Sequence, residues 1–402
     1  MQNTLKKYFI LYLSILFFFS LYFLYTKHEV GNDSTISEWF INYSGGFTKR
    51  GIIGQISIFF SSLLKLNLRD VILFFQILII LFYYIVLYFF IRLQSIERYY
   101  LLALFSPIFL LYPVAEIEVL ARKEIFIFIL FIIHTSIPIH KSNLLRLSKL
   151  FLLPLSILIW EPIIFFLPFW ILFDLLIYKF EKIDKNFIKE MLFYLPALYL
   201  VAYFIFSPMT SEQHAQMALN LKNNYNEICY MSCALLNDKS TIYQQFQGNF
   251  GHYSIEVFVR YFFIILIGFG PLFVLLNYSK LKKNNLLILN KLIKNNVLLV
   301  FLFLLSPALL LFAMGYDWGR WVHISYVLSF ISFVYLLKNK LIDIDIAKLK
   351  EKKLNLINKK TFAIIFLIFC FTWNPKTAIT GDIASFPIYR IPYKFIKINF
   401  LE

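Results

Sequence analysis

Apolar residues dominate the chain in long runs that short polar stretches interrupt. A run of about 20 apolar residues crosses the hydrocarbon core of a bilayer, and several runs here approach or reach that length. We therefore predict an all-α fold, a polytopic integral membrane bundle of about 11 transmembrane helices with a cytoplasmic N-terminus. The predicted spans are residues 8–25, 71–91, 99–114, 125–139, 150–160, 162–178, 191–207, 255–277, 297–314, 322–337 and 362–373.

Three apolar runs need a separate decision. Only residues 160–162 separate the fifth and sixth runs, so these form either two spans or one long, broken helix. The first run follows two lysines, as in a signal peptide, but no small-residue cleavage site comes after it, so it is predicted to stay as the first helix. Residues 52–64 are too short and too rich in serine to span, and they predict an amphipathic or half-buried helix.

Composition and charge agree with a membrane protein. Hydrophobic residues make up 60% of the chain and charged residues only 15%, which excludes a soluble domain of this length. With the N-terminus inside, the lysine-rich connectors carry the whole net charge of +16 on the cytoplasmic side. This is the positive-inside pattern, and it explains the charge without nucleic acid as a partner. We predict one domain, residues 1–402, with outer loops 27–69, 115–124, 208–254 and 315–321 and an outer tail 374–402.

Motifs of metal and nucleotide chemistry are absent from the sequence. The six histidines are scattered, and there is no nucleotide-type glycine loop and no Gly-x-Ser-x-Gly. We therefore expect no metal and no cofactor. The three cysteines are too few for a disulfide framework, but Cys229 and Cys233 can pair if their loop lies outside the cytoplasm, whereas Cys370 falls within a predicted span.

The first outer loop contains a basic stretch with two adjacent glycines, NYSGGFTKRGIIG. Gly45 and Gly46 permit a sharp turn and a close approach of the backbone to a ligand. Lys49 and Arg50 directly precede the predicted short helix. Cations at a helix N-terminus suit a phosphate or pyrophosphate group. A glycine turn with interfacial basic residues is the alternative.

A second charged stretch, AEIEVLARKE, occupies residues 115–124. If this stretch is helical, Glu118 and Arg122 lie four residues apart and form an intrahelical pair. Glu116 or Arg122 can instead face a cavity, because one pair does not neutralise all the ionisable groups of the stretch.

Glu161 is an isolated carboxylate between two apolar runs. Partial burial would raise its pKa toward the range that suits a general base. A solvated carboxylate in a turn is the alternative.

A third charged stretch, MGYDWGRWVH, lies between two predicted spans. Asp317 and Arg320 are three residues apart and share a helical face, with Trp318 and Trp321 beside them. Ionisable residues this close to membrane spans are costly and mark a functional site by default. The alternative is that the two charges only neutralise each other. His323 either joins the site or caps the following span.

Five of the six tryptophans lie on the predicted outer side. An aromatic belt explains this, although a belt is expected at both interfaces and the inner side has no tryptophan. Sugar stacking is the alternative, and it assigns Trp160, Trp318 and Trp321 to carbohydrate rings. Glu256 and Arg260, four residues apart at the entry of a span, are interpreted as a structural pair.

Three short motifs carry a family resemblance: residues 43–51, the Ala-Arg-Lys-Glu stretch 121–124 and the Asp-Trp-Gly-Arg-Trp stretch 317–321. On a chain of many spans, they resemble O-antigen or capsule repeat-unit polymerases of the Wzy type and, more broadly, multispan lipid-linked-sugar transferases. The chain differs from many of these in lacking one very large outer loop, since residues 208–254 are of middling length. The resemblance implies a glycosyltransferase that polymerises polyprenyl-pyrophosphate-linked oligosaccharide repeat units at the outer face of the bacterial inner membrane. It also implies a polyprenyl-linked donor and acceptor, the lipid bilayer and a chain-length regulator protein as partners.

The hypothesis is an inverting, metal-independent glycosyl transfer. Asp317 or Glu161 would take the proton from the acceptor hydroxyl, and cationic side chains would stabilise the leaving pyrophosphate. The predicted pyrophosphate-binding residues are Arg320, Arg122, Arg50 and Lys49.

Two other classes of function stay open. A flippase or transporter of lipid-linked oligosaccharide predicts cations along a path across the membrane, whereas the charges here cluster at one face. A single-addition transferase or ligase predicts one added unit rather than a ladder of products. A purely structural membrane protein leaves the outer charged stretches unexplained.

Overall fold

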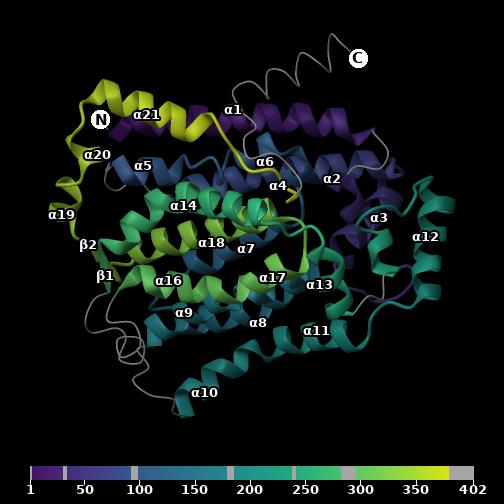
Figure 1. The fold of residues 1–402 in the computed structure, drawn as a ribbon. Helices are drawn as coiled ribbons and strands as arrows, with labels where there is room; N and C mark the ends of the chain where they lie inside the picture. The colour runs from purple at the N-terminus through teal and green to yellow at the C-terminus, as the bar shows by residue number, and fades with distance from the viewer. Residues whose placement is uncertain are drawn as a thin grey trace, which may run out of the picture. The chain divides into compact units, whose positions relative to one another are not determined.

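The computed structural model describes residues 2–29, 34–91, 98–178, 185–237, 241–281 and 296–379. Helices account for most of this part of the chain (Figure 1). Within these described ranges, seven helical segments are long and apolar enough to cross a membrane, which agrees with a helical membrane protein. The count of 11 spans and the side on which the N-terminus lies stay predictions. The seven segments are Lys6–His28, Leu68–Phe90, Ser142–Ile159, Lys185–Phe206, Ile255–Asn277, Val297–Met314 and Trp318–Lys338.

Contacts within the chain define two compact units. Unit 1 comprises Met1–Arg92, Ile117–Ile164 and Ile183–Thr241. Unit 2 comprises Leu93–Glu116, Phe165–Lys182 and Ile242–Glu402. The two units alternate along the sequence, so each is assembled from segments that are distant in the chain. The predicted single domain stays a prediction.

Unit 1 is a series of helices in which each packs on the next. Helix α1 packs on α4, α4 on α7, α7 on α8 and α8 on α11, while the short helix α3 packs on α4. Helix α3 confirms the short helix predicted at residues 52–64. The helices of unit 1 are α1 (Gln2–His28), α2 (Ser34–Ser37), α3 (Gly51–Leu64), α4 (Leu68–Phe90), α7 (Glu124–Ser136), α8 (Ser142–Ile159), α10 (Lys185–Met191), α11 (Leu195–Phe206) and α12 (Ser211–Tyr225). Its 3-10 turns are η1 (Glu38–Phe40), η2 (Ile117–Val119), η4 (Leu192–Tyr194) and η5 (Ala234–Asn237).

Unit 2 is organised around helix α18, which is buried along its length from Trp318 to Leu336. Helices α14, α17 and α9 contact it, and α14 also packs on α5. Strand β1 (Ser279–Leu281) pairs antiparallel with β2 (Ile342–Ile344), with Lys280 opposite Asp343. The helices of unit 2 are α5 (Arg98–Leu104), α6 (Tyr112–Ala115), α9 (Leu167–Tyr178), α13 (Ile242–Phe250), α14 (Ile255–Asn277), α16 (Val297–Leu305), α17 (Leu309–Met314), α18 (Trp318–Lys338), α19 (Ile346–Lys350), α20 (Lys353–Leu356) and α21 (Lys359–Phe371).

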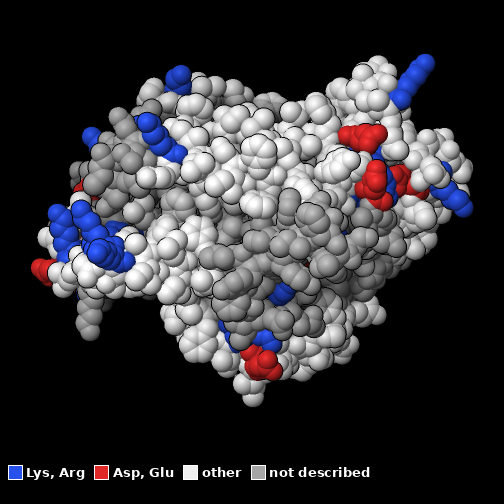
Figure 2. Space-filling model, turned by 90° about the horizontal axis from the view of Figure 1, so that it is seen from above, with Lys and Arg blue, Asp and Glu red and all other residues white. Residues whose placement is uncertain are grey.

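Cationic side chains gather over α19 and α20, at one edge of the face shown in Figure 2. These helices belong to residues 338–360, which are predicted to be cytoplasmic because of their lysines. Most of the described surface on this face is uncharged, as expected for helix walls that contact lipid.

Two predicted spans differ from the observed helices. The predicted span 99–114 is not one helix, because α5 ends at Leu104 and α6 begins only at Tyr112. Pro107 lies in this interval and cannot donate a backbone hydrogen bond, so it opposes a continuous helix. The predicted span 150–160 begins earlier, at Ser142. The chain is interrupted around residues 160–162, where Trp160 is extended and the 3-10 turn η3 (Glu161–Phe166) then leads into α9. Whether the two predicted runs form two spans or one stays a prediction.

Candidate functional site

The charged stretch between α6 and α7 forms a sharp bend rather than a helix. Turn η2 ends at Val119, and Ala121 adopts a left-handed conformation with φ 53°. The Trp39 Nε1 donates to the Ala121 carbonyl oxygen at 3.2 Å, which fixes this bend. A left-handed non-glycine residue is uncommon and strained.

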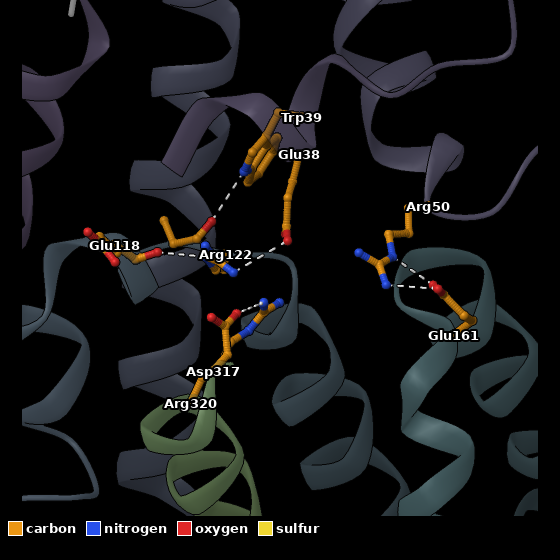
Figure 3. Close-up of polar contacts among 9 residues, drawn as sticks. Glu38, Trp39, Arg50, Glu118, Arg122, Glu161, Asp317 and Arg320 are labelled. Atoms are coloured by element: carbon orange, nitrogen blue, oxygen red, sulfur yellow. Dashed lines mark hydrogen bonds and ion pairs between the residues drawn. The ribbon is translucent and has the colours of Figure 1, made fainter. Parts of the chain in front are cut away.

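Because of this bend, Arg122 and Glu118 do not form the intrahelical pair that was expected for a helical segment. Arg122 Nε instead donates to the Glu118 backbone carbonyl oxygen at 2.6 Å, because the segment is not a continuous helix. Arg122 Nη1 lies 3.7 Å from the Glu38 carboxylate, and both side chains are buried (Figure 3). Glu38 belongs to turn η1, so this contact joins the loop 27–69, which is predicted to be outer, to the 115–124 stretch.

Arg50 and Glu161 form a bidentate ion pair across 111 residues of sequence (Figure 3). Arg50 Nε donates to Glu161 Oε2 at 2.7 Å, and Arg50 Nη2 donates to Oε1 at 2.8 Å. Lys49 Nζ also lies 3.3 Å from Oε1. Arg50 has a left-handed backbone, φ 61°, directly before helix α3 begins at Gly51. The structure therefore brings three predicted site residues, Lys49, Arg50 and Glu161, into direct contact.

Lys123 connects these two groups of contacts. Its Nζ donates to the Arg50 carbonyl oxygen at 2.5 Å, and its side chain is fully buried. The charge of Glu124 also acts on Lys123. We call the whole group the cation cluster: Lys49, Arg50, Arg122 and Lys123 with Glu38, Glu124 and Glu161.

The electrostatics of the cation cluster oppose one prediction. Burial alone would raise the pKa of the Glu161 carboxyl, but the charges of Arg50 and Lys49 and the hydrogen bonds from Arg50 lower it to about 2. A carboxylate with so low a pKa is a weak base, so the raised pKa expected for Glu161 is wrong. Burial lowers the pKa of the Lys123 ammonium to about 7, against an opposing effect of Glu38.

Other parts of the protein occupy the space beside the two glycines of the predicted first outer loop, so this space is not open to a ligand. A Cβ on Gly45 would lie 1.9 Å from the Gln213 carbonyl oxygen of α12. Gly46 has φ 135° and lies against the Gln213 side chain. Gln213 is itself fixed by a capping box with Thr210 at the start of α12. The close approach that the glycines permit is therefore used for packing of α12.

A disulfide closes the loop that follows α12. Cys229 and Cys233 are bonded, which answers a question that the sequence left open. His214 Nε2 lies 3.4 Å from Cys229 Sγ, and these three side chains could otherwise hold a metal ion. Because both sulfurs take part in the S–S bond, neither is a thiolate ligand here.

In unit 2, Asp317 and Arg320 pair with each other, as the more conservative alternative predicted. Arg320 Nη1 donates to Asp317 Oδ2 at 3.1 Å (Figure 3). The Asp317 side chain is 32% exposed, whereas that of Arg320 is 5% exposed. Arg320 also lies over the Trp321 ring, 5.2 Å from its centroid. His323 donates from Nδ1 to the Ile108 carbonyl oxygen at 2.9 Å.

The three tryptophans assigned to sugar stacking are buried in protein. Trp160, Trp318 and Trp321 are 1%, 5% and 8% exposed. Four aromatic rings contact Trp318, including Tyr261 at a centroid distance of 5.1 Å. This burial corrects their assignment as surfaces for sugar rings.

The structure thus groups only part of the predicted site. Lys49, Arg50, Arg122 and Glu161 lie in unit 1, whereas Asp317 and Arg320 lie in unit 2, and a common pyrophosphate site for both sets stays a prediction. Sequence reasoning missed Glu38 and Lys123 as members of the site. Their position could have indicated them, because they lie in the same predicted outer stretches as Arg50 and Arg122.

No family model, no curated protein and no solved structure matches this chain.

Proposed function

We propose that the protein is a membrane glycosyltransferase that polymerises polyprenyl-pyrophosphate-linked oligosaccharide units of a bacterial surface polysaccharide. The observation that carries the proposal is the cation cluster, in which Lys123 joins the Arg50 loop to the Arg122 bend. Cations held by a folded scaffold suit a pyrophosphate, which gains negative charge as it leaves. Strained backbone at Arg50 and Ala121 is also typical of functional sites.

In the proposed reaction, the acceptor hydroxyl oxygen attacks the anomeric carbon of the donor sugar from the face opposite the pyrophosphate. The carbon–oxygen bond to the pyrophosphate breaks, and the leaving group takes the bonding electron pair. Arg50 and Lys49 bind this leaving group, the buried Lys123 holds the Arg50 backbone in place, and the configuration at the anomeric carbon inverts. The hydroxyl proton passes to a carboxylate.

Glu38 replaces Glu161 as the proposed base in unit 1. Glu161 accepts two hydrogen bonds from Arg50, and its low pKa suits the role of holding that guanidinium in place. The contact of Glu38 with Arg122 is longer, at 3.7 Å, and its carboxylate is buried in the same cluster. Asp317 remains the other candidate base, in unit 2.

The outer face is the proposed location of the reaction. The Cys229–Cys233 disulfide supports this location for residues 208–254, because disulfides persist in oxidising compartments. A polyprenyl-linked donor carries its own leaving group and so needs no cytoplasmic nucleotide. The proposed partners are this donor, a second lipid-linked unit as acceptor, the bilayer and a chain-length regulator protein.

The test uses cells that lack their own copy of the gene and express single variants. Arg50→Ala, Lys123→Met and Glu38→Gln are expected to replace the polysaccharide ladder on a gel with a single-unit band. Lys222→Ala, which removes an exposed cation of α12, is the matched control and should keep the normal ladder. Normal ladders from both Arg50→Ala and Lys123→Met would contradict the proposal.

The accumulating intermediate separates the proposal from its rivals. Loss of a polymerase leaves single lipid-linked units at the outer leaflet, whereas loss of a flippase leaves them at the inner leaflet. Loss of a ligase leaves long chains on the polyprenyl carrier. Membrane protein levels of each variant, measured by immunoblot, exclude simple loss of folding.

A further inference from the structure

An open groove of about 510 Å³ lies between α14 and α21 in unit 2. Isoleucine and phenylalanine side chains of both helices form most of its wall, and Glu256 and Arg260 lie at one end. Several of the apolar side chains are about half exposed, including Phe263 at 51% and Ile368 at 56%. Because α14 is a candidate membrane span, a hydrocarbon chain is the natural occupant of this wall.

The polar end of the groove lies at the start of a candidate span, where lipid headgroups are expected. Glu256 and Arg260 lie in the first two turns of α14, a candidate span, and Trp373 lies just beyond the end of α21. Tryptophan is enriched at the membrane–water interface, and a long arginine side chain near a helix end reaches toward it. With α14 spanning the membrane, the charged end of the groove would lie at the interface and its apolar wall beside the acyl chains.

The charged end carries both signs. Arg260 Nη2 donates to Glu256 Oε1 at 3.1 Å, which confirms the predicted structural pair. Arg260 Nη1 also donates to the Ile379 carbonyl oxygen at 3.2 Å, so the guanidinium is held at the end of the groove. The Arg260 side chain is 11% exposed, whereas the Glu256 side chain is 81% exposed and can be reached by a ligand group.

A headgroup with both charges complements this pair better than a purely anionic one. A phosphate gains the guanidinium of Arg260 but is repelled by the carboxylate of Glu256. An ammonium on the same headgroup turns that repulsion into attraction. We infer that the groove binds a zwitterionic aminophospholipid of the phosphatidylethanolamine class, with its phosphate at Arg260, its ammonium at Glu256 and one acyl chain along the wall.

The test measures lipid bound to the full-length protein after purification in detergent and removal of native lipid. The protein is mixed with equal amounts of phosphatidylethanolamine and phosphatidylglycerol that carry identical acyl chains. Native mass spectrometry then counts the bound molecules of each. We expect a preference of about fivefold for phosphatidylethanolamine, the equivalent of one exposed ion pair.

Three variants separate the parts of the site. Glu256→Gln should abolish the preference, with the ratio falling to about one, because the ammonium loses its partner while Arg260 still binds phosphate. Arg260→Gln should lower retention of both lipids, and Ile368→Trp should do the same by filling the groove. Leu302→Trp places the same bulk at an exposed apolar position of α16 outside the groove and should leave retention unchanged.

Three outcomes would overturn the inference: equal retention of the two lipids, an unchanged ratio in Glu256→Gln, or displacement of phosphatidylethanolamine by equimolar polyprenyl phosphate. The last would assign the groove to the carrier of the proposed substrate. Glu256 is largely exposed, so its substitution keeps the test valid even if Arg260→Gln does not fold. The inference does not depend on the proposed function, since lipid binding is measured without glycosyl transfer.

Discussion

Arg50 and Arg320 both bind a carboxylate, but the chain brings their partners together over very different separations. Glu161 lies 111 residues from Arg50 and accepts two hydrogen bonds, at 2.7 and 2.8 Å. Asp317 lies three residues from Arg320 and accepts one at 3.1 Å. The local pair forms as soon as the first turn of α18 forms. The long-range pair requires the fold of unit 1, and it therefore reports that unit 1 has assembled.

The surroundings of the two arginines differ as well. Arg50 has Lys49 beside it and the buried Lys123 on its carbonyl oxygen, so positive charge gathers around it. Arg320 lies over the Trp321 ring, within a local pair of opposite charges. The comparison teaches that a charged pair near a membrane is a weak indication of a site when it is local. Cations that a fold gathers from distant segments are a stronger one.

The largest expected difference concerns replacement of each arginine by lysine. Arg50→Lys loses the bidentate geometry and should lower polymer yield about tenfold, the equivalent of one charge-assisted hydrogen bond of roughly 1.5 kcal/mol. Arg320→Lys keeps a single charged contact and should stay within about twofold. The measurement is radiolabelled polymer formed per unit time in membranes with matched protein levels. Equal losses in the two variants would remove the distinction between the two pairs.

A smaller effect is expected in the pH dependence of stability. The folded-state pKa of Lys123 is about 7, below its ordinary value of 10.5, so the folded state binds fewer protons than the unfolded state between these values. Folding stability should therefore rise as pH increases from 7 toward 10.5. We expect Tm in detergent to rise by about 2–4 °C more in the wild type than in Lys123→Met over this range. Parallel Tm profiles for the two proteins would show that Lys123 does not titrate there.

A third difference is expected in the free energy of unfolding when the carboxylates are neutralised. Glu161→Gln leaves the half-buried Arg50 with a weaker partner and should lower the free energy of unfolding by about 1–3 kcal/mol. Asp317→Asn alters a partly exposed local pair and should change the free energy of unfolding by at most about 0.5 kcal/mol. Chemical unfolding of the two variants in the same detergent measures both values. A larger loss from Asp317→Asn would reverse the proposed order.

Local sequence signals predicted the parts of the fold that depend on neighbouring residues. Hydropathy placed α14 at residues 255–277 with the observed bounds, and spacing alone predicted the pairs Glu256–Arg260 and Asp317–Arg320. The short helix α3 was also predicted, because serines and length distinguish it from a span. These features require only the 3.6-residue period of a helix and the apolar length of a membrane.

Long-range contacts were the part that the sequence did not reveal. The expected pKa of Glu161 was wrong because its partner Arg50 is far away in the chain. Gly45 was interpreted as open to a ligand because nothing nearby indicates that Gln213 fills that space. The break within residues 99–114 was missed because apolar composition continues through Pro107. Composition shows that a segment prefers an apolar environment, but not whether lipid or protein provides it.

The difference between an apolar environment of lipid and one of protein also matters for the insertion of helix α18 into the membrane. Its mean hydropathy is 1.4, against 2.8 for residues 297–314, and its polar members include the buried Ser325, Ser329 and Ser332. A segment partitions into a membrane according to its apolarity, so α18 enters lipid less readily than its neighbours when it stands alone. Its packing partners α9 and α14 both precede it in the chain and so leave the ribosome first. Because α9 and α14 are synthesised first, they provide a protein surface on which α18 can pack before it moves from water into the membrane.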